Sequence, residues 1–185
     1  IIDAYRAQDP NERYEAFQRA FARDGFAFQE VTEQFVPQAL NIPNSQQVPE
    51  DVRQKFLREA EARVQALIAE KPEDARSYVF ATSFYRSTGQ IEQAREYAAL
   101  AQEYSPEKPS IIREQAIVEY QAQNIDQAVE YFKQAYDLNT DNPDAQVGYA
   151  AALILTDQPE EEWRAVLSSP RAQERFLNDQ LVLVF

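Results

Sequence analysis

The sequence of 185 residues contains no histidine, no cysteine and no methionine. Without histidine there is no imidazole base, so the Ser-His-Asp and Cys-His groups of nucleophilic catalysis cannot form. Without histidine and cysteine, the usual protein ligands of zinc, haem and iron–sulfur clusters are missing too. We therefore expect no catalytic residues, no metal ion and no other cofactor in this chain.

Positive charge is scarce as well. The chain carries 18 Lys and Arg residues against 31 Asp and Glu residues, which gives a net charge of −13. Residues 73–185 account for −10 of this charge, since they hold 9 basic and 19 acidic residues. Proteins that bind nucleic acid need a basic surface, so we expect no nucleic-acid partner. An acidic surface instead favours a basic protein or peptide.

Long apolar runs are also missing. The longest strongly apolar stretch, residues 181–185, is far shorter than the roughly 20 residues that a membrane-spanning helix needs. We therefore expect no direct membrane insertion by this chain. The first residue is isoleucine, from which we expect the sequence to be a fragment of a longer protein. The sequence indicates neither a compartment nor an oligomeric state.

The residues that are abundant favour helices. Only 3 glycines are present, which disfavours β-rich folds that turn on glycine. Ala, Glu, Gln, Leu and Arg dominate the sequence, and all of them are good helix formers. The 11 Phe and 10 Tyr residues need a packed interior, so disorder is not expected. Together these features predict a folded, all-α chain.

An internal repeat is visible in the middle of the chain. Ala94 aligns with Ala128, and Ala101 aligns with Ala135, and the two members of each pair are 34 apart. Small residues at fixed spacing are needed where two antiparallel helices cross closely. A pair of short helices cannot bury its apolar face alone, so such units stack on one another.

The residues of one repeat follow a known pattern. A large apolar residue, Tyr78, opens the first helix, Gly89 marks the turn, Ala94 and Ala101 occupy the crossing, and Pro106 ends the unit. This pattern resembles the tetratricopeptide repeat (TPR) family, whose period is about 34 residues. The resemblance implies a right-handed α-solenoid of helix–turn–helix repeats. It is clearest over residues 50–155.

We expect two regions in the chain. Residues 1–49 form an atypical N-terminal helical hairpin and a loop, and residues 50–185 form the tetratricopeptide solenoid, which we expect to continue beyond the last residue. Residues 181–185 are expected to be helical, with a β-strand as the alternative. The predicted helices cover residues 11–23, 26–39, 49–70, 75–87, 91–104, 111–123, 126–138, 145–155, 159–167 and a last segment from residue 169.

The resemblance also implies a binding groove. In this family the first helices of the repeats line a concave surface, and the matching positions here are Arg76, Val79, Ser83, Arg86, Arg113, Ile117, Tyr120 and Val147. The Lys, Asn and Arg set with which some members clamp a C-terminal carboxylate is absent. Arg76, Arg86 and Arg113 either form a cationic spot or are three solvated arginines.

Three hypotheses about function follow. The first is a non-catalytic scaffold that binds a protein or peptide. The second rests on the order of segments along the chain. The aromatic segments 14–17 and 29–35 are followed by a Pro-rich loop, a long helix and the repeats. This order resembles the tail of bacterial O-antigen-ligase-like membrane proteins. That resemblance implies an extracytoplasmic accessory domain of a glycan-transferring membrane protein.

The third hypothesis is a carboxylate glycosidase, which needs two facing acids roughly 5–10 Å apart. The acidic run 160–162 does not meet this need, because adjacent helical residues point in different directions.

Overall fold

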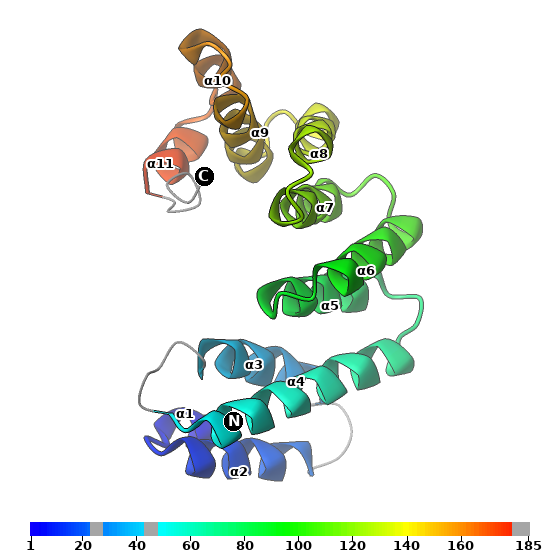
Figure 1. The fold of residues 1–185 in the computed structure, drawn as a ribbon, viewed down its shortest axis with the longest axis vertical. Coiled ribbons are helices and arrows are strands. Elements are labelled where there is room, and N and C mark those ends of the chain that lie inside the picture. The colour runs from blue at the N-terminus through cyan, green and yellow to red at the C-terminus, as the bar shows by residue number, and fades with distance from the viewer. Residues whose placement is uncertain (23–27, 43–47, 179–185) are drawn as a thin grey trace. The chain divides into compact units, whose positions relative to one another are not determined.

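A computed structural model describes residues 1–22, 28–42 and 48–178 of the chain. Within these ranges every regular element is a helix, eleven in all, and no strand occurs (Figure 1). The all-α prediction is therefore confirmed. The chain divides into two compact units, Ile1–Gly89 and Gln90–Phe185. The boundary predicted at residue 49 separates repeat from non-repeat sequence, and it stays a prediction.

The helices of each unit are short and closely spaced along the chain. The first unit contains α1 (Ile2–Arg6), α2 (Pro10–Phe21), α3 (Phe28–Asn41), α4 (Glu50–Glu70) and α5 (Ala75–Ser87). The second contains α6 (Ile91–Tyr104), α7 (Pro109–Gln121), α8 (Ile125–Leu138), α9 (Pro143–Leu155), α10 (Glu160–Val166) and α11 (Pro170–Asn178). The predicted bounds of α4 to α10 agree with these to within two residues. In the described part of the chain, no helix is both long enough and apolar enough to cross a membrane.

The first unit is built around aromatic rings. Phe17 of α2, Phe35 of α3 and Phe56 of α4 are fully buried. The rings of Phe35 and Phe56 stack with centroids 5.6 Å apart, and Phe17 meets Phe35 edge-on at 5.1 Å. Such offset and edge-to-face pairs add to the gain from burying the rings. Helices α2 and α3, in the region predicted as an N-terminal hairpin, thus share an aromatic core with α4.

Two details of the first unit were not predicted. Helix α1 was missed, because five residues are too few to show a helical period. The helix predicted to end at residue 39 continues to Asn41 as α3, with Pro37 inside it. Proline removes only one backbone donor. Buried Val36 and Ala39 on either side of Pro37 hold the turn against the core.

The predicted repeat is confirmed by the backbone. The first helices α5, α7 and α9 are each 13 residues long and begin at residues 75, 109 and 143, which are 34 apart. The turn after each of these helices contains one residue with positive φ, and these residues are Gly89 (77°), Gln123 (64°) and Asp157 (53°), again 34 apart. The same turn geometry therefore recurs in three successive repeats, although only the first uses glycine for it.

Small residues occupy the helix crossings, as the repeat pattern predicts. In the second unit Ala101, Ala128 and Ala135 are between 0% and 1% exposed. Helix α9 also passes very close to α8, since a Cβ atom added to Gly148 would lie 2.8 Å from the ring of Phe132. A large ring in α8 is thus accommodated by the missing side chain in α9.

The strict period ends after α9. Helix α10 has 7 residues, whereas α6 and α8 have 14 each. The next first helix would begin at residue 177 if the period continued, but α11 already begins at Pro170. Helix α11 is therefore out of step with the repeats before it. The predicted helix at residues 181–185, and its strand alternative, lie outside the described residues.

The residues that precede the first helices differ in how well they cap them. Asp74 accepts a hydrogen bond from the backbone nitrogen of Arg76, and Asn142 accepts bonds from those of Asp144 and Ala145. Lys108 occupies the same repeat position before α7 and has a similar backbone conformation, but its side chain makes no capping bond. The four free N–H groups at a helix start are stabilised by such bonds.

We expect Lys108→Asn to raise the free energy of unfolding by about 1 kcal/mol, because it supplies the missing cap. Urea denaturation of the variant and the original chain measures the change. Asn142→Ala is the matched control and should lower the free energy of unfolding by a similar amount. Equal stability of Lys108→Asn and the original chain would contradict the idea that the two repeat positions are equivalent.

Candidate interaction surface

Four of the predicted groove residues lie on one face of α5 in the first unit. Val79 and Ser83 are half-buried. Arg76 is held by the N-cap residue Asp74, with Nη2 2.9 Å from Oδ2, although its side chain is 70% exposed. Arg86 lies ten residues further along α5, which is about 15 Å of helix rise. These two arginines therefore do not form a cationic spot within α5.

Three more of the predicted residues lie on α7 in the second unit. Arg113, Ile117 and Tyr120 follow one another at helical spacing, and all three are half-buried. Ile117 packs at the edge of a core cluster, and Nη2 of Arg113 lies 3.4 Å from Oε1 of Glu114. The exposed parts of these side chains form a mixed apolar and polar strip along α7.

The last predicted groove residue is covered. Val147 of α9 is only 8% exposed, and it belongs to a buried cluster that includes Ala150 and Leu153 of the same helix and Ala172 of α11. Helix α11 packs directly against α9 (Figure 1). The surface that the repeat pattern assigns to α9 is therefore occupied by α11 of the same chain.

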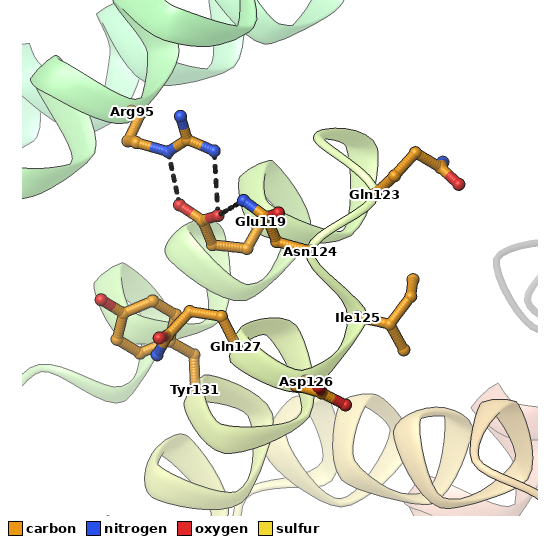
Figure 2. A pocket seen from close by; sticks show the side chains of 8 residues that line it. All are labelled: Arg95, Glu119, Gln123, Asn124, Ile125, Asp126, Gln127 and Tyr131. Atoms are coloured by element: carbon orange, nitrogen blue, oxygen red, sulfur yellow. Dashed lines mark hydrogen bonds and ion pairs between the residues drawn. The ribbon is translucent and has the colours of Figure 1, made fainter.

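A polar cluster that the sequence analysis missed lies beside α7 (Figure 2). Glu119 is only 8% exposed. Arg95 of α6 donates to it from Nε to Oε1 at 2.7 Å and from Nη2 to Oε2 at 3.0 Å. Asn124, in the turn between α7 and α8, donates to the same carboxylate from Nδ2 at 2.7 Å. Two parallel guanidinium–carboxylate bonds are a strong and directional contact.

The cluster borders an open pocket of about 630 Å³. Figure 2 shows that Arg95 reaches across from α6, while the other residues come from the end of α7, the turn and the start of α8. The lining residues are Arg95, Glu119, Gln123, Asn124, Ile125, Asp126, Gln127 and Tyr131. Three of these polar side chains, Arg95, Glu119 and Asn124, already bond to one another.

Both members of the ion pair keep their charge. The hydrogen bonds from Arg95 lower the pKa of Glu119 below its ordinary value of 4.5, against the opposing effect of burial. The bond to Glu119 raises the pKa of Arg95 in turn. Arg95 also bonds to Glu92 through Nη1, at 2.8 Å. The guanidinium therefore links two carboxylates, one buried and one exposed.

The same two repeat positions carry different chemistry at each helix interface. Glu119 corresponds to Tyr85 in the previous repeat, whose hydroxyl donates to Glu61 of α4 at 3.2 Å. An acidic residue at an aromatic core position was the signal that could have revealed the cluster. The corresponding pairs, one in each successive repeat, are Glu61–Tyr85, Arg95–Glu119 and Val129–Leu153.

Other acidic groups show simpler roles. Glu160 begins α10 directly after Pro159 and pairs with Arg164 one turn later, as expected for acidic residues at a helix start. Among residues 1–22, 28–42 and 48–178, no three acidic side chains come together as a possible metal site.

Residues 119–161 match the family model described as tetratricopeptide repeat. This stretch covers the end of α7, all of α8 and α9, and the start of α10. The chain carries tetratricopeptide repeats. The family predicted from the repeat period is therefore confirmed.

Two solved structures have the same TPR-type fold. TTC0263, a thermophilic TPR protein of Thermus thermophilus, is 18% identical with a TM-score of 0.63, over 99% of this chain and 91% of that one. MamA is 12% identical with a TM-score of 0.59, over 94% of this chain and 92% of that one. At such identities the likeness concerns the fold alone. No curated protein sequence matches the chain, and the hypothesis of an O-antigen-ligase-like tail gains no support from these comparisons.

We expect Glu119→Ala to lower the free energy of unfolding by about 1–2 kcal/mol, because it breaks a largely buried bidentate pair. The double variant Arg95→Val, Glu119→Leu copies the residue types of Val129 and Leu153. It should stay within about 1 kcal/mol of the original chain, since matched apolar groups can replace such a pair. Denaturant unfolding of all three proteins measures this. A double variant less stable than Glu119→Ala would contradict the equivalence of the interfaces.

The pair also predicts how stability depends on pH. Because folding lowers the pKa of Glu119, its contribution is complete above the unfolded value of 4.5 and is lost as the pH falls through the folded value. Glu119→Gln should therefore be less stable than the original chain by about 1 kcal/mol at neutral pH, and the difference should shrink as the pH falls below 4.5. Unfolding curves recorded from neutral to acidic pH test this. Glu92→Gln is the control, because its exposed carboxylate touches the same arginine and should matter much less.

Proposed function

We propose that this chain is a non-catalytic scaffold that binds a protein or peptide through the exposed faces of its first helices. The observation that supports this proposal is the repetition of 13-residue first helices at one constant spacing. Each repeat places the same helix positions on the same side of its unit. A regular row of side chains suits an extended partner better than a small molecule.

In the second unit we assign the contact surface to α7. Arg113, Ile117 and Tyr120 combine a charged, an aliphatic and an aromatic side chain, all partly accessible. Partly exposed aromatic and arginine side chains are typical anchors of protein interfaces. The matching positions on α9 are less open, because α11 covers them. In the first unit, Val79 and Ser83 of α5 are the corresponding half-buried positions.

We further propose that the partner is basic. Residues 73–185 carry 9 basic and 19 acidic residues, so the acidic excess of the chain lies in the repeat-bearing region. Such an excess attracts cationic segments and speeds their association at low salt. The arginines of this region are mostly engaged by their own carboxylates, as Arg76, Arg95 and Arg175 illustrate. The acidic residues that are left over after these ion pairs would attract a basic partner.

The test is a selection of peptides from a random displayed library on the immobilised full chain, followed by fluorescence anisotropy with the selected peptides. We expect the recovered peptides to be enriched in Lys and Arg and to bind more weakly at higher salt. Tyr120→Ala should weaken their binding about tenfold, which corresponds to the loss of one aromatic anchor.

Tyr131→Ala is the matched control, since this half-buried tyrosine lies on α8 rather than on the first-helix face. It should leave affinity within about twofold, because non-anchor contacts contribute little. A selection that recovers no peptide, or peptides that respond equally to both substitutions, would rule out the proposed surface. Circular dichroism of both variants ensures that the comparison is made between folded proteins.

A further inference from the structure

Helix α11 does not occupy the place of a further repeat. The first helices α7 and α9 each pack against the second helix that precedes them, α6 and α8 respectively, whereas α11 packs mainly against the first helix α9. It also begins seven residues before the position that the period assigns to the next first helix, residue 177. Its placement therefore needs an explanation other than regular stacking.

A buried glutamine fixes the point where α11 begins. Gln146 of α9 is 0% exposed. Its Nε2 donates to Oγ of Ser168 at 2.9 Å, and its Oε1 accepts from Oγ of Ser169 at 2.9 Å. The hydroxyl of Ser169 in turn accepts from the backbone nitrogen of Ala172 at 3.1 Å, which caps the first turn of α11. The segment before α11 is thus attached directly to α9, and these bonds set where α11 begins.

Helix α11 then covers the groove positions of α9. Arg175 forms an ion pair with Asp144, and Ala172, which is fully buried, joins the cluster that contains Val147. Asp144 and Val147 are the equivalents, one repeat later, of Ser110 and Arg113 on α7. The face of α9 that would bind a partner in a TPR repeat therefore already holds a helix.

The aromatic residue of α11 completes the contact. Phe176 packs against the same cluster and stacks on Trp163 of α10, with ring centroids 5.4 Å apart and an angle of 22° between the planes. Ala172, Arg175 and Phe176 thus form one side of α11, at spacings of three and four residues. The opposite side, with Glu174 and Leu177, is exposed.

The contacts that dock α11 onto α9 are few and partly exposed to solvent. A helix of 9 residues is not stable alone in water, so α11 is helical because it is docked. The Arg175–Asp144 pair is nearly half exposed on both sides, at 46% and 44%, and such pairs contribute little. One ring, one small residue and one exposed pair can be exchanged for a similar set from another chain.

We propose that α11 is a built-in ligand of the α9 face, and that this face recognises an amphipathic helix. The partner has the α11 pattern: a small residue, an arginine three positions later to pair with Asp144, and an aromatic residue next to that arginine. This inference deepens the proposed function and rests on it, since it names the partner of one first-helix face. Binding of such a helix from another protein requires α11 to leave.

The probe for this proposal is a synthetic peptide with the sequence of residues 168–178, titrated into the isotope-labelled full chain and followed by NMR. The opened variant Arg175→Glu, Phe176→Ala removes the docking side chains from α11 and leaves the α9 face intact. The control variant Glu174→Ala, Leu177→Ala changes two exposed residues of the same helix. A tethered segment acts at an effective concentration in the millimolar range, so the original chain should bind the free peptide weakly.

We expect the opened variant to bind the peptide at least tenfold more tightly than the original or control chain, with shifts at Asp144 and Val147. A peptide with Glu in place of Arg175 should bind more weakly, because the exchange removes the ion pair with Asp144. Backbone amides of α11 in the opened variant should exchange with solvent at least tenfold faster, while those of α7 and α8 keep their protection.

Three results would each overturn the proposal. They are unchanged protection of α11 in the opened variant, a peptide that binds all three chains equally or none, and loss of protection in α7 and α8. The last would mean that α11 is a structural end cap rather than a ligand. The library selection that reports on Tyr120 of α7 is scored separately, so a failure of the proposed function can be told from a failure here.

Discussion

Everything in the repeat-bearing part of the chain depends on the close crossing of paired helices. Ala101, Ala128 and Ala135 are fully or almost fully buried, because any larger residue would push the helices apart. Once the crossings are fixed, the starts of the first helices are fixed too, and α5, α7 and α9 begin at a constant interval. The same constraint decides which side of each first helix is used for packing and which side remains for a partner.

A regular stack raises the question of what prevents a helix pair from joining the wrong neighbour. In three successive repeats the same two positions carry a hydrogen bond between Tyr85 and Glu61, an ion pair between Arg95 and Glu119, and the apolar residues Val129 and Leu153. If the stack slipped by one repeat, Glu119 would face Val129 and its buried carboxylate would lose the guanidinium. An unpaired buried charge is far more costly than the pair is favourable. The variety of these interfaces therefore specifies their order.

The sequence predicted the repeat well because its period is long, local and carried by small residues that have few other reasons to recur. Helices α4 to α10 were placed to within two residues, and Gly89 was correctly assigned to a turn. Contacts between distant residues could not be read in this way. Arg95 and Glu119 are 24 positions apart in the sequence and lie on different helices. Nothing in the composition indicates which of the 18 basic residues pairs with which of the 31 acidic residues. The groove positions could be named, but their exposure could not, because the covering helix departs from the period.

That departure follows from one length difference. Helix α10 is seven residues shorter than α8, which removes about two turns, or roughly 10 Å of helix. Helix α10 ends early, and Gln146, in the first turn of α9, bonds to Ser168 and Ser169 in the segment that follows it. A helix that starts there cannot continue the stack in register. It lies along α9 instead, where its small, basic and aromatic residues meet Val147, Asp144 and Trp163. The short α10 and the early start of α11 thus account together for the coverage of the α9 face by α11.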